Sequence, residues 1–187
     1  MRAISRKLPK EVIEMESSKL PKKGKYLKYY LLGFADAEGC FNISLKKQKT
    51  ARFGWVLDPV FHVTQHESNR LVLESFKKTL NCGRIIKKPG QEYTLQFIVD
   101  NRRQLVEKVL PFFDKLVVKE QDYRIFRDIV LALENKDHSD LHKFKRLVRK
   151  AFKMNMGGKQ RRYSLDEVMK DLERQDPQRP YVGHSRE

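Results

Sequence analysis

The stretch LLGFADAEG, which covers residues 31–39, is the most informative part of this 187-residue chain. It ends an apolar segment from Tyr26 to Glu38 in which large residues lie almost all round, and this predicts a helix buried on most faces. Gly33 and Ala37 are four residues apart, so they share one helix face and would let a second such helix approach closely. Glu38 falls at the C-terminal end of the helix, an unfavourable place for an anion unless a cation compensates its charge.

The sequence after this helix alternates pairs of predicted strands with single helices. Alternating apolar and polar residues predict strands at 41–46, 56–64, 84–88 and 93–99, and helical spacing predicts helices at 69–80, 103–113, 121–134, 141–156 and 164–174. In the second hairpin, Ile85, Tyr93, Leu95 and Phe97 are expected on the core face. The order αββαββα with further helices is not that of a doubly wound fold, so we predict an α+β fold in which helices cover one face of an antiparallel sheet.

The composition is strongly basic. Lys and Arg number 40 against 24 Asp and Glu, which gives a formal net charge of +16 and favours a polyanionic partner, nucleic acid first and an anionic membrane surface second. No apolar run approaches the roughly 20 residues of a membrane span, and the N-terminus lacks the apolar stretch of a signal peptide. Cys40 and Cys82 are too few for a disulfide framework or a zinc site. We therefore expect an intracellular protein without a membrane partner, in a bacterial or archaeal cytoplasm or an organelle matrix.

The polar face of the predicted sheet is a candidate for lining a nucleic-acid groove, although an ordinary solvated sheet face is the simpler alternative. Its candidate DNA-binding residues are Asn42, Ser44, Lys46, Asp58, His62, Arg84, Ile86, Lys88, Thr94 and Gln96. Among these, Arg84 and Lys88 suit guanine, and Asn42 and Gln96 suit adenine.

The segment from Leu141 to Arg162 holds nine Lys or Arg and no acid, above an apolar stripe typical of an amphipathic helix. We expect its charges to contact phosphates, with membrane binding or simple solvation as the alternatives. The candidates are Lys143, Arg146, Arg149, Lys150, Lys153, Lys159, Arg161 and Arg162. The domain organisation that follows is a basic N-terminal arm at 1–24, a core at 25–137 and a basic helical extension at 138–187.

The stretch at 31–39 resembles the nine-residue signature of the LAGLIDADG homing endonucleases. The resemblance extends to the strand end Val63-Thr64-Gln65, to the segment 116–119 that ends in Lys119, and to the run at 154–159, so that it covers about residues 26–162 in the same order. The chain departs from the family pattern at Leu32, where a small residue is common, and at Cys40, where a small hydroxyl residue is common. Only one copy of the motif is present.

This resemblance implies a homing endonuclease, a metal-dependent phosphodiester hydrolase that leaves staggered ends in double-stranded DNA and initiates intron mobility. With one motif per chain, it implies a homodimer paired through Gly33, Phe34 and Ala37, and a long pseudo-palindromic target, often in a ribosomal RNA gene. The family fold places a saddle-shaped antiparallel sheet on the DNA, with residues 25–137 as the endonuclease core.

The same resemblance assigns roles at the site. Glu38 of each subunit would bind Mg²⁺, with Mn²⁺ or Ca²⁺ able to replace it, and the carbonyl of Ala37 or Gly39 could contribute. Gln65 would position water and Lys119 would stabilise charge. An intron maturase that binds intron RNA is the main alternative, and a DNA-binding regulator on the same scaffold is a third. The acid at Glu38 favours the enzyme, because binding RNA alone gives no evident need for it.

Overall fold

The computed structural model describes residues 20–21, 24–155 and 161–175. It divides into two compact units. The first unit comprises 1–40 and 61–120, and the second comprises 41–60 and 121–187. Most of the N-terminal arm, the Gly157-Gly158 pair, Lys159 and the C-terminal tail lie outside the described residues.

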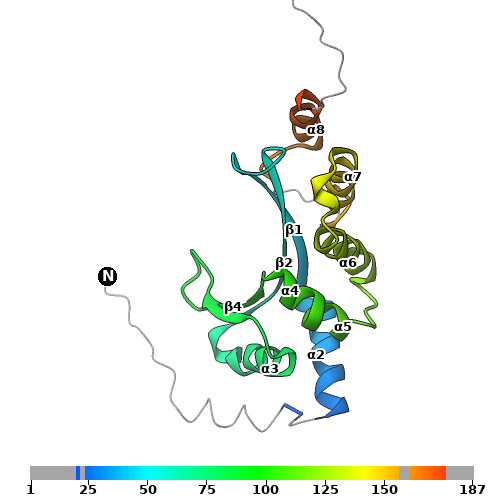
Figure 1. Ribbon diagram of the computed structural model, residues 1–187. Helices are drawn as coiled ribbons and strands as arrows, with labels where there is room; N and C mark the ends of the chain where they lie inside the picture. The colour runs from blue at the N-terminus through cyan, green and yellow to red at the C-terminus, as the bar shows by residue number, and fades with distance from the viewer. Residues whose placement is uncertain (1–19, 22–23, 156–160, 176–187) are drawn as a thin grey trace, which may run out of the picture. The chain divides into compact units, whose positions relative to one another are not determined.

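The observed elements follow the predicted order αββαββα (Figure 1). They are α2 (Lys25–Glu38), β1 (Gly39–Lys47), β2 (Trp55–His66), α3 (Arg70–Leu80), β3 (Arg84–Lys87), β4 (Thr94–Val99), α4 (Arg102–Gln104), α5 (Leu110–Phe112), α6 (Glu120–Glu134), α7 (Leu141–Phe152) and α8 (Leu165–Arg174). The strands form one sheet in the order β1-β2-β4-β3, and β4 pairs antiparallel with both β2 and β3. The α+β fold is therefore confirmed.

Local signals explain where several helices begin and end. α3 stops because Asn81 adopts a left-handed conformation with φ 49°. Ser164 caps the start of α8, because its hydroxyl accepts a hydrogen bond from the Glu167 amide at 3.1 Å. The predicted helix at 103–113 contains a π-helical stretch, Leu105–Val109, between α4 and α5. α7 ends at Phe152, earlier than predicted.

A cluster of aromatic rings forms the core of the first unit, where α3 covers one side of β4 (Figure 1). Phe61 of β2 packs on Phe113 with ring centroids 4.8 Å apart, and Phe76 of α3 stacks on Phe97 of β4 at 6.0 Å. Tyr93, which we expected on this core face, is half exposed, so that prediction is wrong. It lies in the turn before β4, outside the alternating pattern of the strand.

In the second unit, α6 and α7 lie on one side of β1 (Figure 1). Phe41 of β1 packs on Tyr123 and Phe126 of α6 at 5.2 and 5.3 Å between ring centroids. Phe53 packs on Phe144 of α7 at 5.8 Å. The apolar positions of the strands therefore face these helices, and the polar positions face away from them.

α2 differs from the prediction of a helix buried on most faces. Leu31, Leu32 and Ala35 are buried, but Tyr26 is 80% exposed and Tyr29 is 49% exposed. The first unit therefore buries one side of α2 and leaves apolar residues on its other side exposed. Among the described residues, no helix is long and apolar enough to cross a membrane.

Candidate functional site

The C-terminal end of α2 is held to the segment that precedes α6 by the side chain of Asp36. Its carboxylate accepts hydrogen bonds from three successive backbone amides, those of Val117, Val118 and Lys119, at 2.9, 3.0 and 2.9 Å. Partial burial alone would raise the pKa of Asp36, but these amides and the charge of Lys119 outweigh it, so the pKa lies below the ordinary value. Asp36 therefore fixes the backbone at Lys119.

The side chain of Lys119 returns to the same helix end. Its Nζ donates to the backbone carbonyls of Asp36 and Ala37 at 2.8 and 2.7 Å. These carbonyls belong to the last turn of α2, where the helix dipole favours a cation. Lys119 thus places a positive charge on the last carbonyls of α2, next to Glu38 in the sequence, where the expected compensation came from a divalent metal.

Glu38 is the last residue of α2, and its side chain is exposed. In the described part of the chain, its carboxylate takes part in no ion pair. The chain then turns sharply at Gly39, where a Cβ would lie 2.6 Å from the carbonyl oxygen of Ala35. Any residue can adopt the φ of −75° found at Gly39, so glycine is needed there for the close approach of the Ala35 carbonyl and not for its backbone conformation.

The residues at this end fit half of a metal site. No group of three or more His, Cys, Asp or Glu able to hold a metal lies within the described ranges. Mg²⁺ prefers oxygen ligands and keeps several waters, so one carboxylate per chain would need a second carboxylate and phosphate oxygens to complete its shell. Of the two predicted carbonyl ligands, that of Ala37 already accepts a hydrogen bond from Lys119, whereas none from Lys119 reaches Gly39.

Gln65 lies near the end of β2, in register with Leu95 of β4. This register places Gln65 on the same sheet face as the core residues, while its neighbours Thr64 and His66 are on the open face. Its Oε1 accepts a hydrogen bond from Asn69 Nδ2 at 3.1 Å. The structure therefore brings Glu38 and Lys119 to one helix end. Gln65, in contrast, is hydrogen-bonded to Asn69.

The exposed face of α2 carries aromatic and small residues. Tyr26, Tyr29, Gly33 and Ala37 are all exposed, and a Cβ added to Gly33 would meet no atom within 4 Å. Of the predicted pairing residues, Phe34 is the exception, because it is partly buried against Phe76 of α3 at 6.2 Å between ring centroids.

In the first unit, the strand register places the predicted polar residues on one face. Opposite positions in the ladder are His62 with Ile98, Thr64 with Gln96 and His66 with Thr94, and on β3 Arg84 lies opposite Ile98 and Ile86 opposite Gln96. Arg84 is committed to Asp100 by two hydrogen bonds of 2.7 Å, which raise its pKa. The pKa of His62 is lowered by burial and then by the charge of Lys88, which favours the neutral ring.

In the second unit, the open face of the strands carries Asn42, Ser44, Lys46 and Asp58. Asn42 Nδ2 donates to Ser44 Oγ at 3.0 Å, and Lys46 pairs with Asp58. Both contacts order side chains that sequence analysis could only place on a common face.

The predicted phosphate contacts of the C-terminal segment divide into two kinds. Lys143 and Lys150 form ion pairs with Asp137 and Asp128 at 2.8 and 2.6 Å. Arg161 is partly buried, which lowers its pKa, and it is directed inward to the carbonyl of Ala151. The other described members, Arg146, Arg149, Lys153 and Arg162, are exposed.

Sequence reasoning gave no role to Asp36. The residues that Asp36 contacts are more than 80 positions away, so no local pattern contains them. No local signal in the sequence points to this contact, because the three amides precede α6 and meet Asp36 only in the folded chain.

Comparisons with known proteins show the family to which the chain belongs. The family model described as LAGLIDADG endonuclease matches residues 31–133, and the chain belongs to that family. It is 33% identical over 150 residues to the homing endonuclease I-ApeII of Aeropyrum pernix, a match that covers 77% of this chain and 89% of that protein. It is also 40% identical over 120 residues to the DNA endonuclease I-CeuI of Chlamydomonas moewusii, covering 61% of this chain and 55% of that protein. The match therefore spans about half the length of that relative.

Two solved structures are similar in fold. The archaeal intron-encoded homing endonuclease I-Vdi141I complexed with DNA has a TM-score of 0.73 at 38% identity and covers 79% of this chain and 94% of that one. The group I intron-encoded homing endonuclease I-CeuI complexed with DNA has a TM-score of 0.74 at 26% identity and covers 92% of this chain and 100% of that one. These relatives agree with the predicted family and fold class.

Proposed function

We propose that this chain is a site-specific homing endonuclease that cuts both strands of a long, pseudo-palindromic DNA target as a homodimer. The observation that carries the proposal is the end of α2, where an exposed carboxylate, Glu38, follows directly on the carbonyls that bind Lys119. A fixed cation next to an exposed acid suits a site that must bind a metal ion and a phosphate together.

The exposed face of α2 supports the homodimer. Tyr26 and Tyr29 present apolar surface, and Gly33 and Ala37 leave room for a second helix backbone. A twofold axis along this face pairs identical residues, so each α2 would bring its own Glu38 to the same place. One motif per chain then yields one complete site per dimer.

The chain's own groups divide the chemistry. The two Glu38 carboxylates hold the metal, Lys119 stabilises the negative charge that develops on the phosphate, and Gln65 orients water. Mg²⁺, or Mn²⁺ or Ca²⁺ in its place, supplies charge neutralisation and activation of the attacking water when bound. Asp36 acts as a positioning residue, because it holds the backbone of Lys119 at the helix end.

In this proposal, the open strand face of each unit contacts DNA. Polar side chains there suit base edges in the major groove, and the net charge of +16 supplies attraction to the backbone. Hydrogen bonds such as Gln96 Nε2 to Thr64 Oγ1 at 3.1 Å fix side chains in advance of binding. We place the target in an intron-free ribosomal RNA gene of a bacterial, archaeal or organelle genome.

The test is cleavage of a DNA library that includes intron-free ribosomal RNA genes, followed by sequencing of every new end. Wild type with Mg²⁺ should give staggered breaks at one long site, and Glu38→Gln should bind that site without cutting it. Glu74→Gln is the matched control, since Glu74 is an exposed acid on α3. Equal, cut-free binding by wild type and Glu38→Gln would replace the nuclease with the maturase or the regulator.

A further inference from the structure

The outer face of α7 carries a row of basic side chains. The buried residues of this helix are Leu141, Phe144, Lys145, Leu147, Val148 and Ala151, and they lie on the opposite side from the basic row. The exposed set is His142, Lys143, Arg146, Arg149, Lys150 and Lys153. At 1.5 Å per residue, Lys143 to Lys153 extends about 15 Å along the helix.

A groove of about 430 Å³ lies along this row, between α6 and α7. Asp128 and Ala132 of α6 line one side, and Arg146, Lys150 and Lys153 of α7 line the other. Lys150 is anchored to Asp128, and Lys143 to Asp137, so these two charges are held in place. In the described chain, Arg146, Arg149 and Lys153 take part in no ion pair and are available to an external anion.

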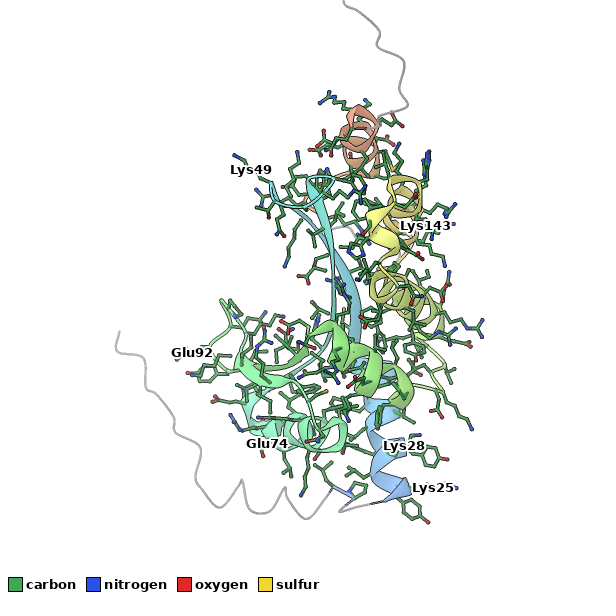
Figure 2. All side chains as sticks on the ribbon, in the orientation of Figure 1. Lys25, Lys28, Lys49, Glu74, Glu92 and Lys143 are labelled. Atoms are coloured by element: carbon green, nitrogen blue, oxygen red, sulfur yellow. The ribbon has the colours of Figure 1, made fainter. Side chains whose placement is uncertain are left out.

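This groove lies on the opposite side of the second unit from the open face of its strands. Phe144 packs on Phe53, in the turn that joins β1 to β2, so the basic side of α7 points away from this turn. Figure 2 shows Lys143 on the side of α7 that faces away from β1. A duplex on the open strand face of this unit therefore cannot also occupy the groove.

We propose that the α7 row and its groove bind the phosphate backbone of a second DNA duplex, without sequence preference, while the sheet holds the target. About 15 Å of helix matches four to five phosphates of one strand, which are spaced about 3.4 Å along the duplex axis. The exposed residues of α7 lack the apolar side chains that insert into a membrane, and they include no Phe, Tyr or Trp to stack on unpaired bases. Two binding faces would let the protein pass directly from one DNA segment to another during target search.

The role in target search rests on the proposed function, but the binding itself does not, so the test requires no cleavage. The full-length Glu38→Gln protein is bound to an immobilised 40-bp duplex, washed, and then exposed to a fluorescent duplex of unrelated sequence. The α7 variant adds Arg146→Gln, Arg149→Gln and Lys153→Gln, which removes charge but no internal ion pair. The control adds Lys77→Gln, Lys78→Gln and Lys170→Gln, an equal charge change at exposed positions elsewhere.

We expect the parent and the control to recruit the second duplex, and the α7 variant to lose at least about tenfold of this recruitment. Capture of the α7 variant on the first duplex should change by less than about threefold. No recruitment by the parent, or equal recruitment by the α7 variant, would overturn the proposal. An equal loss of capture on the first duplex would also overturn it, because α7 would then contact the target. Displacement of the second duplex by duplex RNA at a lower concentration than by duplex DNA would overturn it as well. If the library experiment shows no cleavage, recruitment of the second duplex can still be interpreted, because it measures binding alone.

Discussion

Lys119 and Asp36 are joined by two hydrogen bonds, and Lys119 is the donor in both. The backbone amide of Lys119 donates to Asp36 Oδ1 at 2.9 Å, and Lys119 Nζ donates to the backbone carbonyl of Asp36 at 2.8 Å. The two contacts fix both the backbone and the side chain of Lys119 at the end of α2. Although Lys119 lies in a loop, it is therefore held as firmly as a residue within a helix. A group that stabilises a transition state requires such a fixed position.

Removal of the Asp36 carboxylate should therefore affect catalysis more than DNA binding. Asp36→Ala leaves three backbone amides without their acceptor, at a cost of about 2–3 kcal/mol in the free energy of unfolding. We expect cleavage to fall by about tenfold to a hundredfold, because Lys119 loses its fixed position. Turnover and DNA affinity measured on the same preparations would separate the two effects.

Asp114→Ala serves as the control for Asp36→Ala, since among the described residues Asp114 pairs with Lys28, in an exposed contact at 3.7 Å. It should retain both stability and cleavage. Unchanged cleavage by Asp36→Ala, in a folded protein, would remove Asp36 from the positioning role.

The lowered pKa of Asp36 predicts a pH dependence of stability. A carboxylate whose folded pKa lies below its unfolded value stabilises the protein above the unfolded pKa, and this stabilisation is lost as the pH falls. The contribution should thus be complete at neutral pH and decline below about pH 4. Urea unfolding of wild type and Asp36→Asn should show the largest difference at pH 7 and 5, and a smaller one at pH 3. A difference that grows on acidification would contradict this assignment.

Gly33 and Gly39 should respond in opposite ways to substitution. Gly33 faces open space, so Gly33→Leu should fold, with about 0.5–1 kcal/mol gained in helix propensity, but its side chain should block pairing of α2 helices. Gly39→Ala should instead destabilise the fold by about 1–3 kcal/mol, because its Cβ would meet the Ala35 carbonyl. Sedimentation and thermal unfolding of both variants provide the check. A stable dimer of Gly33→Leu would place the interface elsewhere.

The basic charge predicts a steep loss of DNA affinity with salt. Each phosphate contact contributes about −0.9 to the slope of log K against log salt, so ten contacts would lower the affinity by about 10⁵ between 50 and 200 mM salt. Fluorescence anisotropy with the target duplex measures this slope. A nearly flat dependence would count against binding through the backbone.

Much of the fold follows from local pattern. The alternation in β1, β2 and β4, and the stripe of α3, are visible in the sequence because each element buries one face. Tyr93 shows the limit of this reasoning, since its apolar side chain extends the strand pattern but its backbone belongs to a turn. The exposed tyrosines of α2 show another, because a pattern reports which residues need cover and not whether the same chain supplies it.

The site was less accessible from sequence than the fold. Glu38 and Lys119 could be named by their resemblance to the family, but the hydrogen bonds that join their surroundings connect residues more than 80 positions apart. The commitment of Arg84 to Asp100 and of Arg161 to the Ala151 carbonyl likewise depends on tertiary contacts. Charge patterns identify candidates for phosphate contact, and only the structure separates available side chains from those already paired.

The central claim is that two copies of Glu38 form one shared active site. Its most direct test is a mixed dimer of wild type and Glu38→Gln, isolated with a different affinity tag on each chain and assayed on a plasmid that carries the target. A shared site predicts that this dimer binds the target but makes no double-strand break. It also predicts no nick in either strand, whereas nicking of one strand would contradict the claim, because the wild-type chain would then hold an active site of its own.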